Sequence, residues 1–421
     1  MPPTRLPLPE WLRRLETLSP NEIDLGLERV AEVLGRMALE PPARTIIVGG
    51  TNGKGSSVEM LRALLSGDDV VGTYTSPHVI RYNERIAVNG LPASDEEIVA
   101  AFEHVEAARD DVPLTYFEFG TLAAFAVFDT AKVDTAILEV GLGGRLDAVN
   151  VVDPDASLIT NVSLDHCEWL GDDVEKIGFE KAGIMRAGRP AVFADPDMPG
   201  SVALHAESVG AELLRAGRDY SWTTEDDARW SWRGRRIELP DLALPALRGP
   251  IQLQNAAGAL ALVEALGLER LLQPAHVNRA FGSLRLPGRM QVIERQQRWL
   301  LDVAHNPAAA AALAASLLQQ QARATVAIVG ILDDKDVEGI IGPLAARVDN
   351  WIAVTASSPR AIDAAELARR VANATGKACL IADSPDIAIE RARLMAESGD
   401  VLVTGSFFTV GPVLERLSAR D

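Results

Sequence analysis

Short apolar runs alternate with amphipathic helical patterns along most of the chain. The first buried strand is predicted at residues 45–48, and a helix follows at residues 57–65, where Val58, Leu61 and Leu64 recur on one face. Strands that alternate with helices in this way indicate a parallel sheet flanked by helices. Further buried strands are predicted at residues 135–140, 157–162 and 191–193.

The pattern changes over residues 219–247, which are rich in Trp, Arg, Asp and Pro. This stretch predicts a small β insertion of antiparallel strands and turns before a helix at residues 254–266. Pro287-Gly288 then interrupts the chain. A second alternation follows it, with strands predicted at residues 299–303, 325–329, 351–354 and 401–404 and helices at residues 307–321, near Ile340 and at residues 363–374.

This organisation predicts an α/β protein of two domains, residues 1–286 and residues 287–421. A length of 421 residues is too great for one ordinary core, so it agrees with that division. The first domain is expected to hold a parallel sheet and the β insertion, and the second to be a smaller α/β unit of three layers.

Composition narrows the functional class. The formal net charge of −18 argues against nucleic acid as a partner, because it repels phosphate in the absence of a basic patch. Mean hydropathy is +0.07, and no apolar run approaches the ~20 residues that a membrane span needs. The chain has two cysteines and no apolar stretch near Met1, so we expect a cytoplasmic protein without a secretory signal or disulfides.

A glycine-rich run, Gly49-Gly-Thr-Asn-Gly-Lys-Gly-Ser56, lies between the first predicted strand and the first predicted helix. Glycines let backbone N–H groups turn toward phosphate oxygens, and the helix N-terminus adds its positive dipole end. The run departs from the usual Walker pattern, because Gly55 follows Lys54 and Val48 stands at the earlier glycine position. A tight turn that caps a helix is the alternative. The predicted ATP contacts are Gly50, Thr51, Asn52, Gly53, Lys54, Gly55 and Ser56.

From this loop onward, the motifs resemble those of the folylpolyglutamate synthases, relatives of the Mur peptidoglycan ligases. The resemblance spans roughly residues 24–336. Val149 and Cys167 depart from residues that are common in the family, and neither replaces a group with an assigned role. Besides the loop, the matching segments are Ser76-Pro-His78, Glu84-Arg-Ile86, Phe117-Glu-Phe119, Leu138 to Asp147, Asp165-His166, Glu180 to Gly183, Gln254-Asn255, Pro287-Gly-Arg289 and Leu301 to Pro307.

The resemblance implies a P-loop-type ATP-binding domain like the Mur central domain, followed by a Rossmann-like glutamate ligase domain. Residues 23–29 are similar to a stretch that bacterial bifunctional members use near dihydropteroate. The expected enzyme therefore adds L-glutamate to dihydropteroate, as a dihydrofolate synthase, and γ-linked glutamates to tetrahydrofolate. ATP would convert the acid to an acyl phosphate, which the amine of glutamate displaces, with release of ADP and phosphate. We expect a monomer in folate and one-carbon metabolism.

Oxygen-bearing residues suit Mg²⁺, which prefers such ligands. Ser56, Ser76 and Glu139 supply them from separate loops, and the resemblance adds His166. Glu139 ends an apolar strand, where an unpaired carboxylate would be costly, so it needs a metal or a salt-bridge partner. A hydrogen-bonded structural histidine is the alternative for His166. The resemblance implies two Mg²⁺ ions and leaves a monovalent cation requirement open.

Lys181 matches a family lysine that CO₂ carbamylates, which turns a cation into an anionic metal ligand. The alternative is a surface lysine paired with Glu180 or Asp165. With Lys54 and His166, Lys181 completes the predicted catalytic set.

The resemblance also implies nucleotide contacts at Asn255, Arg289 and Asp302, with ATP bound between domains that close. His305 is a further candidate, and capping of the helix at Pro307 is its alternative. Asp334-Lys335-Asp336 matches a family motif without an assigned role. The candidates for binding the pterin acid are Asp24, Leu25, Thr115, Tyr116, Phe117, Glu118, Leu146, Asp147 and Ala148.

Phe117 and Phe119 have two interpretations: they stack on a pterin ring, or they belong to the core, as aromatics on a strand more often do.

Three other functions are alternatives to the ligase. A Mur-type ligase would need an N-terminal nucleotide-sugar domain, yet the phosphate loop begins within 50 residues of Met1. A non-catalytic ATP switch, or a plain ATPase, would need the loop but gives no reason for Glu139, His166 and Lys181 to occur together.

Overall fold

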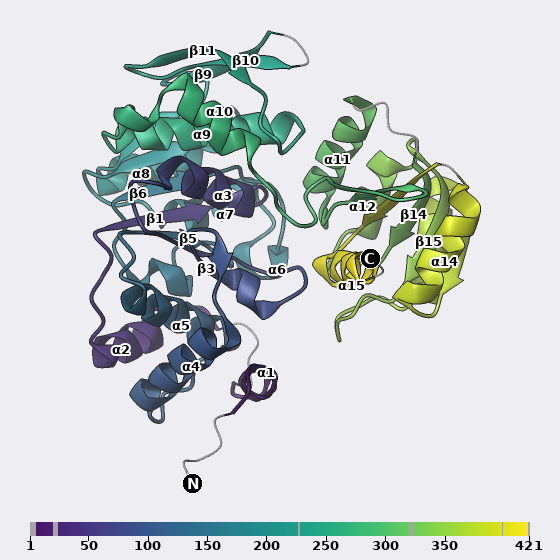
Figure 1. The fold of residues 1–421 in the computed structure, drawn as a ribbon, viewed down its shortest axis with the longest axis horizontal. Coiled ribbons are helices and arrows are strands. Elements are labelled where there is room, and N and C mark those ends of the chain that lie inside the picture. Colours follow the sequence, from purple (N-terminus) through teal and green to yellow (C-terminus); the bar gives the residue numbers. More distant parts are fainter. Residues whose placement is uncertain (1–5, 20–23, 226–227, 320–323, 398, 420–421) are drawn as a thin grey trace. The chain divides into compact units, whose positions relative to one another are not determined.

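The computed structural model describes residues 6–19, 24–225, 228–319, 324–397 and 399–419. The chain forms two compact units, coloured purple to green and green to yellow in Figure 1. The larger comprises Met1–His78, Tyr82–Leu244 and Gln254–Leu284, and the smaller comprises Val79–Arg81, Pro245–Leu253 and Arg285–Asp421. None of the described helices combines the length and apolar character that crossing a membrane requires.

The larger unit is built on an eight-stranded sheet with the order β4-β3-β2-β5-β1-β6-β7-β8. Its pairs are parallel from β2 to β8, whereas β3 and β4 add antiparallel strands at one edge. The predicted parallel sheet is therefore confirmed, with an antiparallel edge that the apolar pattern did not indicate. The strands are β1 (Arg44–Gly49), β2 (Val71–Tyr74), β3 (Ile86–Val88), β4 (Leu91–Pro92), β5 (Thr135–Glu139), β6 (Ala156–Ile159), β7 (Pro190–Phe193) and β8 (Glu212–Arg215).

Helices cover this sheet, and the core includes Phe119 and Phe128 from one helix and Ile47 and Leu138 from neighbouring strands. The helices are α1 (Leu8–Glu16), α2 (Glu28–Met37), α3 (Lys54–Leu65), α4 (Asp95–Arg109), α5 (Tyr116–Thr130), α6 (Cys167–Leu170), α7 (Val174–Ala182), α8 (Gly200–Val209), α9 (Pro250–Ala265) and α10 (Pro274–Gly282). Short 3₁₀ turns are η1 (Tyr82–Arg85), η2 (Ala148–Val151) and η3 (Glu269–Leu271).

The small β insertion is present as an antiparallel sheet of β9 (Ser221–Thr224), β10 (Arg229–Arg233) and β11 (Glu238–Ala243). Two contacts fix it to α9. The indole nitrogen of buried Trp232 donates to the carbonyl of Ala257 at 3.1 Å. The buried carboxylate of Glu264 accepts three backbone N–H groups from residues 235–237 at 2.8–2.9 Å.

The smaller unit has a six-stranded sheet with the order β12-β13-β17-β14-β15-β16, parallel except for the β12–β13 pair. Trp351 is buried in the core of one face with Leu313, Ile340 and Leu367, and Trp299 in the core of the other. The predicted three layers are thus present. The elements are β12 (Gln291–Glu294), β13 (Arg298–Leu301), α11 (Pro307–Gln319), β14 (Ala324–Val329), α12 (Val337–Leu344), β15 (Val348–Val354), α13 (Ala364–Thr375), β16 (Cys379–Ala382), α14 (Pro385–Ala396), β17 (Asp400–Thr404) and α15 (Phe407–Ser418).

One local prediction is wrong. Phe117 and Phe119 lie on helix α5, not on a strand, because Thr115 and Glu118 form a capping box that starts the helix. The Thr115 hydroxyl accepts from the amide of Glu118 at 3.3 Å, and the Glu118 carboxylate accepts from the amide of Thr115 at 2.7 Å. The expected helix end at residues 320–321, and Ile23 of the N-terminal motif, lie outside the described residues.

Candidate active site

The glycine-rich loop leaves β1 and enters α3 at the carboxyl edge of the large sheet. Gly50 has φ +135° and Gly53 has φ +86°, a region that favours glycine. A Cβ on Gly50 would lie 1.8 Å from the Thr160 hydroxyl, and one on Gly53 would lie 2.7 Å from the Asn255 amide nitrogen. Both glycines are therefore required by shape, and Asn255 from α9 lies against the loop.

Two residues after β6 hold the loop in place. Asn161 accepts from the backbone N–H of Asn52 and donates to its carbonyl, both at 3.0 Å. The Thr160 hydroxyl donates to the same carbonyl at 2.6 Å. Thr160 and Asn161 were assigned no role from the sequence. Their position was the signal that could have found them, because both are polar and directly follow a buried strand, β6, at the carboxyl edge of the sheet.

Two lysines converge on one carbonyl of the loop. Lys54 Nζ donates to the carbonyls of Gly50 and Thr51 at 3.2 Å each, and Lys181 Nζ donates to the same Gly50 carbonyl at 3.1 Å. Lys181 is 4% exposed. Burial and, to a smaller extent, the nearby Lys54 charge lower its pKa from the ordinary value to about 7. At neutral pH a large fraction of this amine is uncharged, which suits reaction with an electrophile.

The surface-lysine alternative for Lys181 fails. Glu180 pairs instead with Arg145, whose Nη2 lies 2.9 Å from its Oε1. Asp165 acts on Lys181 through its charge, which raises the lysine's pKa, but less than burial lowers it.

Oxygen atoms that suit a divalent ion lie at the same edge. Parallel pairing places Glu139 beside Val48, at the start of the loop. The Glu139 carboxylate is buried and accepts from the backbone N–H of Ser76 at 3.1 Å. The Ser56 hydroxyl is fully buried and makes no hydrogen bond to the described residues, which is costly for a polar atom unless a ligand completes it.

These groups fit a magnesium ion that takes its remaining ligands from water or phosphate. His166 follows β6, has φ +52° and precedes α6, with its amide on the Asp165 carboxylate at 2.9 Å. Among the described residues, no three His, Cys, Asp or Glu side chains gather into a metal cluster. A metal held by Ser56, Ser76, Glu139 and His166 would therefore depend on serine oxygens and on Lys181 in modified form.

The candidate acid-binding residues surround the loop after β5. Phe117 is half-buried and packs closely on Gly141, since a Cβ added to this glycine would lie 2.7 Å from the Phe117 Cζ. Its ring centroid lies 5.7 Å from that of Tyr74. Phe119 is instead fully buried and contacts Trp11 and Phe102. The two aromatics thus separate: Phe117 faces the loop that leads to Leu146, whereas Phe119 belongs to the core.

Asp147 lies in that loop and is 3% exposed. Its carboxylate accepts from the amides of Leu142 at 2.8 Å and Val149 at 3.1 Å, so it fixes the loop on both sides. Burial raises its pKa to about 6, against the lowering effect of these amides and of the Lys54 charge. Leu146 and Ala148 flank it on the same turn.

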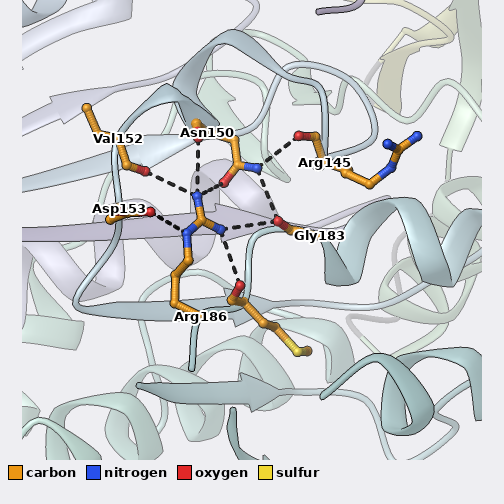
Figure 2. A network of polar contacts seen from close by, with 7 residues as sticks. Arg145, Asn150, Val152, Asp153, Gly183 and Arg186 are labelled. Carbon is orange, nitrogen blue, oxygen red and sulfur yellow. Dashed lines mark hydrogen bonds and ion pairs between the residues drawn. The ribbon is translucent and has the colours of Figure 1, made fainter. Parts of the chain in front are cut away.

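A polar network ties this loop to the helix that carries Lys181 (Figure 2). Arg186 donates to the Asn150 side chain at 3.0 Å and to the carbonyls of Gly183 and Val152 at 3.3 and 3.5 Å. Asn150 in turn donates to the carbonyls of Arg145 and Gly183 at 3.0 and 3.1 Å. Hydrogen bonds therefore join the loop after β5 to the C-terminal end of α7.

Glu118 and Asp24 share a partner that sequence reasoning missed. Arg29 on α2 donates to Glu118 at 2.9 Å and lies 3.1 Å from the Asp24 carboxylate. Since Glu118 also caps α5 through Thr115, both of its oxygens are already bonded. We interpret Glu118 as a residue that joins α2 to α5. Leu25 is half-buried beside Asp24, and Tyr116 begins α5.

Three further candidates lie in the smaller unit, and two of them, Arg289 and His305, contact Phe407. The guanidinium of Arg289 lies 5.1 Å from the Phe407 ring, and the His305 ring lies 5.8 Å from it. Buried Asp302 accepts from the amides of Met290 and Ala304 at 2.9 Å each. Burial raises the pKa of Asp302, while the Arg289 charge lowers it.

A capping contact of α11 comes from Asn306, whose side chain accepts from the amide of Ala309 at 2.9 Å. The Nδ1 atom of His305 contacts the carbonyl of Val303 at 2.8 Å. In the Asp334-Lys335-Asp336 motif, the Asp336 carboxylate caps α12 by accepting a hydrogen bond from the amide of Gly339, and Lys335 Nζ lies 3.2 Å from the Asp334 carboxylate. That gives the motif a local structural role.

Comparison with known proteins agrees with this geometry. Residues 48–263 match the model of the Mur ligase middle domain, and residues 288–407 match that of the Mur ligase glutamate ligase domain. The dihydrofolate synthase/folylpolyglutamate synthase of Escherichia coli K12 is 41% identical over 100% of this chain and 97% of its own length.

Solved structures agree as well. E. coli FolC in complex with DHPP and ADP has a TM-score of 0.93 at 40% identity, with 100% of each chain covered. A bifunctional folylpolyglutamate synthase/dihydrofolate synthase with Mn, AMPPNP and L-glutamate bound has a TM-score of 0.89 at 41% identity, with 98% of each chain covered. With its glycine-rich loop, two lysines and a carboxylate at one sheet edge, the chain belongs to the dihydrofolate synthase/folylpolyglutamate synthase family of Mur ligases.

Proposed function

We propose that this chain is an ATP-dependent ligase that adds L-glutamate to dihydropteroate and γ-linked glutamates to tetrahydrofolate. The observation that carries the proposal is the convergence of Lys54, Lys181 and Asn255 on the loop at residues 49–56, with Glu139 at the same strand edge. Full-length similarity to bifunctional enzymes supports both reactions. The Mur-type alternative is weaker, since the curated relatives that match nearly the whole chain act on folate precursors by name.

The chemistry follows from the residues. A carboxylate is a poor electrophile, so ATP first transfers its γ-phosphoryl group to the acid and ADP leaves. The glutamate amine then attacks the acyl carbon, the C–O bond to phosphate breaks, and the amine loses a proton. Backbone amides of the loop and Lys54 hold the phosphates, because such a transfer needs positioning and charge neutralisation above all. Asn161 and Thr160 keep that loop rigid.

Ser56, Ser76, Glu139 and His166 are the proposed ligands of Mg²⁺, which when bound neutralises charge on the transferring phosphoryl group. The buried, unbonded Ser56 hydroxyl supports this set. We also propose that CO₂ carbamylates Lys181, with the lysine's lowered pKa as support, since carbamate formation needs the neutral amine. A second ion and a monovalent cation remain parts of this proposal.

The remaining assignments are proposals of the same kind. We assign residues 1–286 to ATP and acid binding and residues 287–421 to a glutamate ligase domain, with Arg289, Asp302 and His305 contacting ATP. Phe407 contacts both the Arg289 guanidinium and the His305 ring, and this shared contact supports a common role of the two side chains in ATP binding. We also propose that the acid-binding set contacts the pterin acid, and half-buried Phe117 against the loop that carries Asp147 supports this. We further propose that the protein is a monomer and that it is cytoplasmic, the location being in agreement with two free cysteines.

The test is phosphate release from Mg·ATP and glutamate with no acid, with dihydropteroate and with tetrahydrofolate. Release that requires either acid supports the ligase. Release that is equal without an acid would favour a plain ATPase, and no release in any mixture would favour a non-catalytic switch.

A further inference from the structure

An arginine with no assigned role lies between aromatic rings in the larger unit. Arg85 ends the η1 turn, and its Nε donates to Nδ1 of His78 at 2.9 Å. Its guanidinium carbon lies 5.4 Å from the ring centroids of both Tyr82 and Tyr116. A planar cation held by one hydrogen bond and two aromatic faces has a fixed orientation.

No carboxylate of the described residues pairs with Arg85. Its hydrogen bond goes to His78, its other contacts are the two tyrosine rings, and its Nη groups make no hydrogen bond within the described part of the chain. Other arginines of the larger unit differ, since Arg29 pairs with Glu118 and Arg62 with Glu59. A half-buried guanidinium without a counter-charge is well suited to receive an anion.

The arginine lies beside the candidate active site. Its carbonyl accepts from the backbone N–H of Thr75 at 2.8 Å, and the next residue, Ser76, donates to Glu139 at 3.1 Å. Tyr116, which covers Arg85, directly precedes Phe117 at the start of α5. A ligand that reaches from Phe117 toward Glu139 would therefore pass near the guanidinium.

Dihydropteroate and tetrahydrofolate differ in the number of carboxylates that they would bring near Arg85. Dihydropteroate has a single carboxylate, the aryl one that must be phosphorylated. The glutamyl tail of tetrahydrofolate has two, of which the γ-carboxylate reacts and the α-carboxylate stays charged. A site that serves both acids needs a cation for that second carboxylate only when it extends folate.

We propose that Arg85, oriented by His78, Tyr82 and Tyr116, binds the α-carboxylate of the folate tail and is a specificity residue for glutamate-chain extension. This inference rests on the proposed bifunctional activity. Arg85 then has no part in dihydrofolate synthesis, so a substitution of Arg85 should impair glutamate-chain extension and spare dihydrofolate synthesis.

The experiment compares Arg85→Gln and Arg85→Lys with wild type, measuring phosphate release with each acid and the KM for the acid, glutamate and ATP. Arg85→Gln is expected to raise the KM for tetrahydrofolate about 10- to 100-fold, the value of a charge-assisted hydrogen bond, and that for dihydropteroate less than about 3-fold. Arg85→Lys should recover part of the loss. Arg13→Gln, at a side chain that is 73% exposed, is the matched control.

Equal increases for both acids would overturn the proposal, as would a selective rise in the KM for glutamate, which would make Arg85 the receptor of the incoming amino acid. If Arg85→Gln does not fold, His78→Ala decides, because it keeps the charge and removes its alignment. It should raise the KM for tetrahydrofolate selectively, and an equal effect on both acids would refute the idea. Wild-type enzyme that turns over neither acid would instead refute the proposed function.

Discussion

Replacing Lys181 with methionine should stabilise the protein at neutral pH while it abolishes activity. The lysine is 4% exposed and lies near the Lys54 charge, so the folded chain disfavours its protonated form. Its pKa is 10.5 in the unfolded chain and about 7 in the folded chain. That difference costs on the order of 4 kcal/mol of folding free energy at pH 7.

The substitution also removes the hydrogen bond from Lys181 to the Gly50 carbonyl, worth about 1 kcal/mol. That carbonyl keeps its bond to Lys54 at 3.2 Å, so it is not left unsatisfied. The expected net gain for Lys181→Met is therefore about 3 kcal/mol at pH 7.

The sign of the pH dependence follows from the lowered pKa. Below pH 10.5 the unfolded chain binds a proton at Lys181 that the folded chain binds only below about pH 7. The wild type thus loses stability as pH falls from 10.5 to 7, and the advantage of Lys181→Met is largest at and below pH 7. The advantage should shrink as pH rises, until near pH 10.5 only the loss of the hydrogen bond to Gly50, about 1 kcal/mol, remains.

The assay is urea unfolding, followed by tryptophan fluorescence, at pH 7 and pH 9.5 in bicarbonate-free buffers, which keep the lysine unmodified. Lys176→Met is the control, because this lysine lies on the same helix, is 64% exposed and pairs with Asp172. It should change stability by less than about 1 kcal/mol. A variant at Lys181 that is less stable than wild type at pH 7, or a difference that does not vary with pH, would refute the reasoning.

Other variants test the loop and the metal ligands. Gly53→Ala should lower the free energy of unfolding by about 1–2 kcal/mol and raise the KM for ATP, because its Cβ would lie 2.7 Å from Asn255 and its φ is +86°. Urea unfolding and ATP titration measure both effects. Gly55→Ala, whose Cβ would lie 3.6 Å from Glu139, is the control with the milder expected effect. Lys54→Ala should abolish phosphate release and leave the circular dichroism spectrum unchanged, and wild-type turnover would contradict the phosphate-loop assignment. Glu139→Gln should raise the Mg²⁺ concentration needed for half-maximal activity at least about 10-fold, whereas an unchanged requirement would remove it from the ligand set.

Local sequence patterns predicted the central strands and the loop well. Residues 45–48 and 135–140 are mostly apolar because they lie in the middle of the sheet, and Lys54 follows the glycines that the turn requires. Helix α5 was missed because Phe117 and Phe119 alternate like a strand, although Thr115 and Glu118 have the spacing of a capping box, which is a sequence signal for a helix start.

Tertiary pairs were beyond the reach of sequence reasoning. The bonds of Asn161 to Asn52 join residues more than a hundred positions apart, and so does the contact of Lys181 with Gly50. Arg29 and Glu118 likewise come together only when α2 packs beside α5. Residue types at strand ends indicated where chemistry lies, but not which neighbours hold each group.

The most direct test of the central claim is mass spectrometry of the products formed from Mg·ATP and L-glutamate with dihydropteroate or with tetrahydrofolate. The account predicts one added glutamyl residue on dihydropteroate and at least one γ-linked residue on tetrahydrofolate, each matched by one phosphate released. Extension of tetrahydrofolate alone would contradict the assignment of Asp24 and its neighbours to dihydropteroate. Absence of any glutamyl product, with ATP still hydrolysed, would contradict the ligase.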